Sequence, residues 1–146
     1  MNIEQGLTIL DFRSKQTGIF KSNMNKHDLE ERLISFAVLI IEIVEEMPDT
    51  KAANHLAGQL LRSGTSSALN YGEAQSGESR RDFIHRIKIV LKELRESYIC
   101  LKIIYRTKLY KEDKKINSAL NESNELITIF VKSVETAQKN SQLQSL

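Results

Sequence analysis

The residues whose types and spacing best suit a chemical role are six basic side chains in one segment that is predicted to be helical. A helix turns by about 100° per residue, so side chains three, four and seven positions apart share a face. This geometry puts the six within a sector of roughly 80° and along about 37 Å of helix. We call them the basic row: Arg81, Lys88, Lys92, Arg95, Lys102 and Arg106.

The basic row predicts a negatively charged partner, because like charges at these spacings repel one another. Residues 79–107 hold eight basic and three acidic side chains, a net charge of +5. Residues 28–47 hold six acidic side chains and one basic one, a net charge of −5. Four of these acids share a face: Asp28, Glu31, Glu42 and Glu46.

Three interpretations of the basic row stay open at this stage. The phosphate backbone of a nucleic acid attracts such a row whatever its base sequence. The acidic face of residues 28–47 is a second partner, and it would have to come from another copy of the chain, because the first and third helices of a bundle lie diagonally. The third interpretation is a basic face that meets only solvent.

Five polar residues could form either a catalytic cluster or a structural polar network. Four lie on adjacent faces of the second predicted helix, and the fifth lies on the third and could join them. Buried polar groups have to be paired with one another, which favours the structural network. The five residues are Ser63, Ser66, Asn70, Glu73 and Glu96.

Other kinds of chemistry find little support. Asp82 and His85 have the spacing of di-metal helical bundles, but such sites need a second copy of the motif and two further glutamates. Cys100 lies between apolar residues, so we expect its thiol to be buried and not to act as a nucleophile. Tyr110, between two lysines, is a candidate for stacking on a base. Phosphate loops and nucleophile elbows are lacking, so we predict no catalytic residues, no metal, no cofactor and no enzyme.

The elements that must position these residues are helices. The 146 residues include one proline and six glycines, and neither type occurs after residue 78. Pro48 ends the first helix, Asp49 can cap the second, and Ser79 with Asp82 can cap the third. Apolar residues at steps of three and four predict helices over residues 28–47, 49–75, 79–107 and 111–139. Short links between them predict an all-α, antiparallel up-down-up-down four-helix bundle.

The apolar pattern also predicts how the helices pack. On the third helix it places seven side chains on the core face: Ile84, Ile87, Leu91, Leu94, Tyr98, Leu101 and Tyr105. On the second, Gly64 and Gly72 each cost about 1 kcal/mol relative to alanine, a cost that close approach of a neighbouring helix usually offsets. On the first, Ile34, Val38 and Ile41 widen the apolar face beyond the needs of one core. This surplus predicts a homo-oligomer.

The bundle is expected to span residues 26–139, after a loosely ordered arm over residues 1–25 with a short helical turn near residues 8–15. A polar, frayed tail is expected over residues 140–146. The sequence contains no run of about 18 uncharged apolar residues, the length that a helix needs to cross a membrane. A secretory signal is lacking, and the single cysteine suits a reducing compartment. A cytoplasmic protein is therefore expected.

Two segments carry a resemblance to a known family: QLLRSGTSSALNYGEA at residues 59–74 and DFIHRIKIVLKELRE at residues 82–96. They resemble the bacterial four-helix-bundle family named after the protein encoded in intervening sequences of 23S ribosomal RNA genes, and are similar to accessory proteins of diversity-generating retroelements. The resemblance implies a left-handed bundle that assembles as a barrel-like homopentamer, with a suspected nucleic-acid-binding role and no known enzymatic activity. Leu69 and Gly72 depart from the family pattern, in which alanine and a larger residue are usual.

Residues and resemblance together predict a non-catalytic oligomeric scaffold that binds the backbone of RNA or DNA through the basic row. It would act as an accessory to RNA or to a nucleoprotein enzyme. The alternative is a protein-interaction module whose charged faces only hold the oligomer together.

Overall fold

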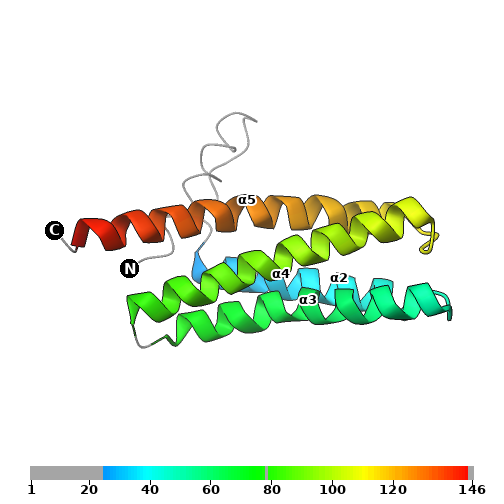
Figure 1. Cartoon of the computed structure of the whole chain (residues 1–146), viewed down its shortest axis with the longest axis horizontal. Helices are drawn as coiled ribbons and strands as arrows, with labels where there is room; N and C mark the ends of the chain where they lie inside the picture. Colours follow the sequence, from blue (N-terminus) through cyan, green and yellow to red (C-terminus); the bar gives the residue numbers. More distant parts are fainter. Residues whose placement is uncertain (1–24, 78, 145–146) are drawn as a thin grey trace.

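The computed structural model describes residues 25–77 and 79–144, and within these ranges the chain forms four helices and no strand. Each helix begins at the end of the molecule where the preceding helix stops (Figure 1). The predicted all-α class is confirmed, whereas the predicted N-terminal arm falls almost entirely outside the described residues. The helices are α2 (Lys26–Glu45), α3 (Lys51–Gln75), α4 (Arg80–Thr107) and α5 (Asp113–Gln144).

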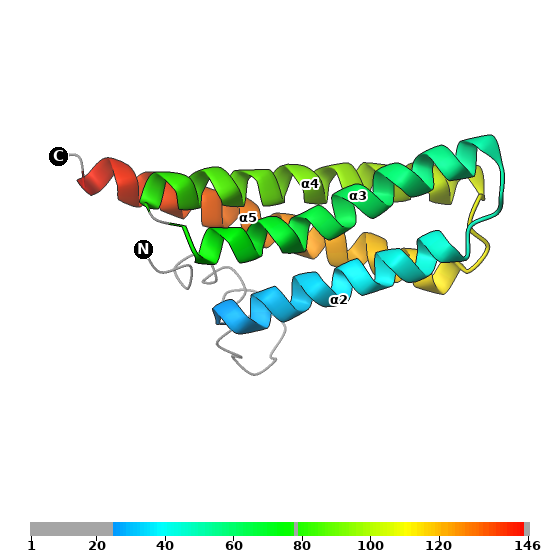
Figure 2. The same cartoon turned by 90° about the horizontal axis from the view of Figure 1, so that it is seen from below.

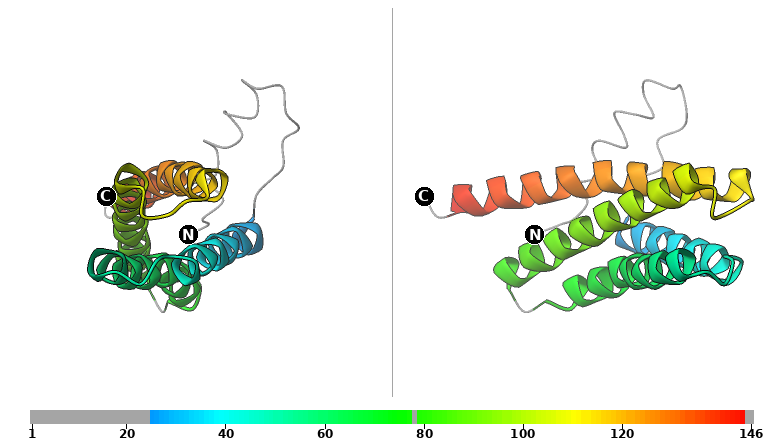
Figure 3. Two further views of the ribbon diagram at one scale, coloured as in Figure 1. Left: turned by 90° about the vertical axis from the view of Figure 1, so that its right-hand side faces the viewer. Right: turned by 45° about the vertical axis from the view of Figure 1, so that its right-hand side comes forward.

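The order of the helices around the molecule determines which surfaces stay free. Helix α3 packs between α2 and α4 (Figure 2), and α4 packs between α3 and α5. The end-on view in Figure 3 shows the order α2, α3, α4, α5, with α2 and α4 across from each other. Helix α2 contacts α5 less extensively than it contacts α3. The outward face of α4 is therefore not covered by α2.

Local hydrogen bonds explain where α2 and α4 begin. Asn25 and Asp28 form a capping box, because the side chain of each accepts a hydrogen bond from the backbone N–H of the other. At the start of α4, the Oγ of Ser79 accepts from the backbone N–H of Asp82 at 3.1 Å, which is the Ser79 half of the predicted cap. Helix α2 ends at Glu45, before the predicted residue 47.

The start of α3 differs from the prediction by one residue. Thr50 caps the helix, with its Oγ1 accepting from the backbone N–H of Ala53 at 3.2 Å. Asp49 instead accepts a hydrogen bond from the side-chain amide of Asn54 at 2.8 Å. Helix α4 ends at Thr107, and the C-cap residue Lys108 has a φ of 60° in the left-handed region. Helix α5 begins two residues after the predicted position and continues five residues beyond the predicted end.

A single hydrophobic core joins the four helices. Tyr71 of α3 and Phe130 of α5 are fully buried and meet edge to face, with ring centroids 5.7 Å apart and an interplanar angle of 83°. Helix α4 buries four of the seven predicted core residues, Ile87, Leu91, Leu94 and Leu101, and also buries Val90, Ser97, Cys100 and Ile104. The remaining three, Ile84, Tyr98 and Tyr105, are half-buried.

The two glycines of α3 occupy different surroundings. A Cβ at Gly64 would lie 2.9 Å from Cγ2 of the fully buried Ile40, so α2 approaches α3 closely there, as predicted. A Cβ at Gly72 would meet nothing within 4 Å. The expected close approach is therefore wrong at Gly72. Over the part of the chain that the structure describes, no helix is long and apolar enough to cross a membrane.

Candidate nucleic-acid interface

The basic row lies along α4, where five of its side chains are exposed and Lys102 is half-buried. The Lys102 ammonium lies 4.9 Å from the centre of the Tyr98 ring, a cation–π contact that leaves its charge uncompensated. Among the described residues, no carboxylate forms an ion pair with any member of the row. The row therefore keeps its full charge for a partner outside this part of the chain.

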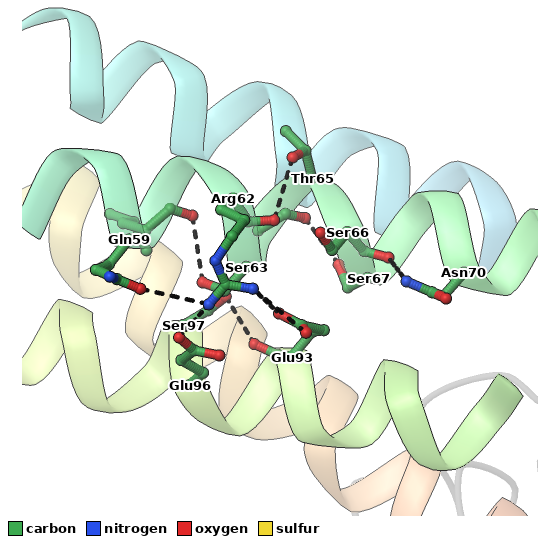
Figure 4. Close-up of polar contacts among 12 residues, drawn as sticks. Gln59, Arg62, Ser63, Thr65, Ser66, Ser67, Asn70, Glu93, Glu96 and Ser97 are labelled. Carbon is green, nitrogen blue, oxygen red and sulfur yellow. Dashed lines mark hydrogen bonds and ion pairs between the residues drawn. The ribbon is translucent and has the colours of Figure 1, made fainter. Parts of the chain in front are cut away.

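Two acids of α4 are bound by one arginine of the neighbouring helix. The NH1 group of Arg62 on α3 lies 3.2 Å from Oε2 of Glu93, and its NH2 group donates to Glu96 (Figure 4). The hydrogen bond to Glu96, followed by the charge of Glu93, raises the pKa of Arg62. Both acids lie on the side of α4 that faces α3. They therefore share the charge of Arg62 and form no ion pair with the basic row.

The structure brings together some of the predicted polar network and separates the rest. The buried hydroxyls of Ser63 and Ser97 lie 2.8 Å apart, and Ser97 donates to the backbone carbonyl of Glu93 at 2.9 Å (Figure 4). Glu96 joins this group through Arg62. The sequence did not reveal Arg62, Glu93 or Ser97 as members, although each lies on the facing surfaces of two adjacent helices.

The other predicted members lie toward the end of α3. Asn70 donates to the backbone carbonyl of Ser66 at 2.9 Å and accepts from NH1 of Arg86 at 3.3 Å. Ser66 thus contributes a backbone atom to this contact. Glu73 is exposed, and its backbone carbonyl accepts from Ser76. These residues form ordinary contacts within and between helices and are not arranged as a nucleophile with an adjacent base.

The acidic face of α2 is partly neutralised by α5. The Nζ of Lys115 lies 2.8 Å from Oε1 of Glu46 and 3.8 Å from Oε2 of Glu42. The hydrogen bond from Lys115, followed by that from Tyr110, lowers the pKa of Glu46. Fewer acids of α2 are therefore free to meet another copy than the sequence suggests.

Tyr110 is not available for stacking on a base. Its side chain is buried, and its hydroxyl donates to Oε2 of Glu46 at 2.7 Å. Burial and this hydrogen bond raise the pKa of the phenol. The stacking role expected from the two flanking lysines is therefore wrong, because tertiary packing turns the ring inward.

Apolar side chains interrupt the second half of the basic row. Ile99 and Ile103 are 53% and 43% exposed, although they lie among the cations of α4. They open onto a groove of about 480 Å³ between α3 and α4. The groove is lined by His55, Leu56, Gln59, Arg95, Glu96, Ile99, Cys100 and Ile103. The same helical geometry that defined the row puts Ile99 in line with Arg81, so the sequence already contained this signal.

The remaining candidates show no sign of reactivity or metal binding. The thiol of Cys100 is buried and donates to the carbonyl of Leu56 at 3.4 Å. Burial, followed by the charge of Glu96, raises the pKa of this thiol to about 11, so it is protonated at neutral pH. Asp82 and His85 are both exposed. Within the described ranges, no three His, Cys, Asp or Glu side chains gather as metal ligands would.

The fold and the basic row define an all-α protein that offers a cationic helix face. A family model described as 23S rRNA-intervening sequence protein matches residues 25–132. The chain belongs to the 23S rRNA-intervening sequence protein family, as its resemblance predicts.

One solved structure gives a direct comparison. It is a protein of unknown function from the S23 ribosomal protein family of Bacteroides thetaiotaomicron, and its sequence is 28% identical to this chain. The two structures align with a TM-score of 0.68 over 75% of this chain and 97% of that chain. Among curated proteins, none matches the sequence.

Proposed function

We propose that this protein is a non-catalytic helical scaffold that binds the phosphate backbone of a nucleic acid, RNA or DNA, through the basic row of α4. The observation that carries the proposal is the uncompensated charge of the row. Its six cations have no carboxylate partner in the described part of the chain, and the acids Glu93 and Glu96 are bound by Arg62 instead.

A linear polyanion fits this arrangement for electrostatic reasons. Cations that neutralise phosphates release condensed counterions, which favours binding without reading the base sequence. A row about 37 Å long can meet several phosphates at once. The name of the family refers to an intervening sequence of 23S rRNA, so RNA is the first ligand to test. A nucleoprotein enzyme is the second partner to test.

The proposal includes self-association. We propose that the chain folds as an antiparallel, left-handed bundle and assembles as a homo-oligomer in the cytoplasm. The number of subunits that the family resemblance implies is five. The exposed Ile34, Val38 and Ile41 on α2 support self-association, because a contiguous exposed apolar face commonly marks an interaction site.

The alternative is a protein-interaction module without a nucleic-acid ligand. Ile99 and Ile103 favour it, because apolar side chains among cations suit a protein partner better than a phosphate backbone. In that case the charges would serve only to hold copies of the chain together.

Binding of a labelled structured RNA, measured by fluorescence anisotropy at low salt, separates the two. The variant Arg81→Gln/Lys88→Gln removes two exposed cations from the half of the row that lacks Ile99 and Ile103. A matched control, Lys51→Gln/Lys111→Gln, removes two exposed cations that lie off α4. We expect weaker binding only for the first variant. Equal loss in both, or no binding by the unaltered protein, would reject the proposal.

A further inference from the structure

We propose that the apolar ridge of α2 in one copy docks into the groove between α3 and α4 of the next copy. The ridge consists of Ile34, Val38 and Ile41, and the groove is centred on Ile99 and Ile103. This inference rests on the self-association in the proposed function and identifies the two faces that meet.

The ridge points away from the core of its own molecule. Its three side chains are 42%, 50% and 41% exposed. They follow one another at steps of four and three residues, so they share one face of α2. The exposed carboxylates of Glu31 and Glu45 lie beyond its two ends, and neither forms an ion pair with another described residue. The ridge is thus an apolar strip with an acid at each end.

The groove has the opposite charge pattern. Its apolar part comprises Ile99 and Ile103 at the surface, with Leu56 and Cys100 deeper. Exposed cations lie beyond its two ends on α4, at Lys92 and at Arg106. The groove is thus an apolar hollow with a base at each end.

The two patterns match in length. Glu31 and Glu45 are fourteen residues apart, which is about 21 Å along a helix. Lys92 and Arg106 are also fourteen residues apart, and therefore span the same distance. When the ridge lies in the groove, each acid can meet a base whichever way the two helices run.

The charges also disfavour the symmetric alternatives. Packing one ridge against another would bring acid to acid, and packing one groove against another would bring base to base, which destabilises both. A contact between two different faces is heterologous, and a heterologous contact that closes on itself forms a ring. In such a ring Lys92, Arg95 and Arg106 lie at contacts between copies. The nucleic acid of the proposed function then contacts only the part of the basic row outside this contact, which includes Arg81 and Lys88.

Cysteine cross-linking tests which faces meet. In a Cys100→Ser background, one chain carries Val38→Cys, a second carries Ile99→Cys and a third carries both changes. A short bis-maleimide should cross-link the third chain into a ladder of covalent oligomers and leave the first two as single chains. No ladder from the third chain would overturn the inference. Cross-linking of either single-cysteine chain with itself would do the same, because it would show a symmetric contact.

The size of the particle in sedimentation velocity gives an independent test. Val38→Glu and Ile99→Glu should each reduce the oligomer to smaller species. Leu69→Glu is the matched control, because Leu69 is 69% exposed on α3 and does not line the groove. The inference fails if the two variants sediment as the control does. Loss of RNA binding by Arg81→Gln/Lys88→Gln would still support the proposed function in that case, so the two failures are distinguishable.

Discussion

Arg62 of α3 places its NH1 group 3.2 Å from the Oε2 oxygen of Glu93 on α4. The Glu93 side chain is only 10% exposed, so its charge is compensated at the contact between the two helices and not by water. Arg62 binds Glu96 as well. Arg62 offsets one of the two negative charges of these acids, so the positive field along the basic row is stronger than the charge count of α4 alone predicts.

Replacing Arg62 tests the structural importance of this pairing. Arg62→Met should lower the thermal unfolding temperature, because it leaves the carboxylate of Glu93 mostly buried without its partner. Arg62→Met combined with Glu93→Gln should recover part of the loss. The measurement is circular dichroism during heating at neutral pH. The interpretation is wrong if Arg62→Met melts at the same temperature as the control Lys88→Met, in which an exposed cation of α4 outside this pairing is removed.

The two glycines of α3 should respond to alanine with opposite signs. Gly64→Ala should reduce the free energy of unfolding by about 1–3 kcal/mol, as overpacking usually does. The new Cβ would lie 2.9 Å from Cγ2 of Ile40, whose β-branched side chain has little freedom to move. Gly72→Ala should increase the free energy of unfolding by about 0.5–1 kcal/mol, because alanine favours the helix and meets nothing. Urea unfolding measures both, and a gain in stability at residue 64 would contradict the close approach of α2.

Tyr110 lies in the link after α4, and its hydroxyl connects this link to Glu46 at the end of α2 through a hydrogen bond. Tyr110→Phe keeps the buried ring and removes the hydroxyl that donates to Glu46 at 2.7 Å. We expect a loss of about 0.5–1.5 kcal/mol in the free energy of unfolding, the usual contribution of one hydrogen bond. The pKa of Glu46 should also rise toward its ordinary value, because this hydrogen bond helps to lower it. NMR titration of the Glu46 carboxyl can detect the change, and an unaltered pKa would argue against the bond.

Cys100 should react slowly with thiol reagents while the protein is folded. Its pKa is raised to about 11 by burial, so the reactive thiolate is scarce at neutral pH. The rate of alkylation, followed by mass spectrometry, should therefore still be rising with pH above 9.0, the ordinary value for this thiol. The same shift makes the fold lose stability as the pH rises from 9.0 to about 11, because the buried site disfavours the thiolate. Rapid alkylation at neutral pH would show that the thiol is accessible.

Much of the fold follows from local signals in the sequence. Steps of three and four between apolar residues identified the helices, and Ser79 marked the start of α4 because its side chain can satisfy a free backbone N–H. Thr50 and Asp49 both have side chains that can cap a helix, and the choice between them depends on the path of the link. The basic row could be predicted from the sequence because all six residues lie on one helix, where the spacing along the chain alone determines which side chains share a face.

The contacts between helices could not be read in the same way. Arg62 lies 31 positions before Glu93, and Lys115 lies 69 positions after Glu46. Pairing over such separations depends on which helices are neighbours and on how each is rotated about its axis. The rotation of α4 also decided that Tyr98 and Tyr105 are half-buried while Val90 and Ile104 are fully buried. Ile99 is the exception, because helical geometry alone puts it within the row.

The dependence of RNA affinity on salt tests the central claim most directly. The logarithm of the binding constant of the unaltered protein should fall linearly with the logarithm of salt concentration, with a slope set by the number of phosphates contacted. In Arg81→Gln/Lys88→Gln the slope should be shallower by about two, because each lost phosphate contact removes about one unit. An unchanged slope in this variant would contradict the account, since it would show that Arg81 and Lys88 do not contact the phosphates.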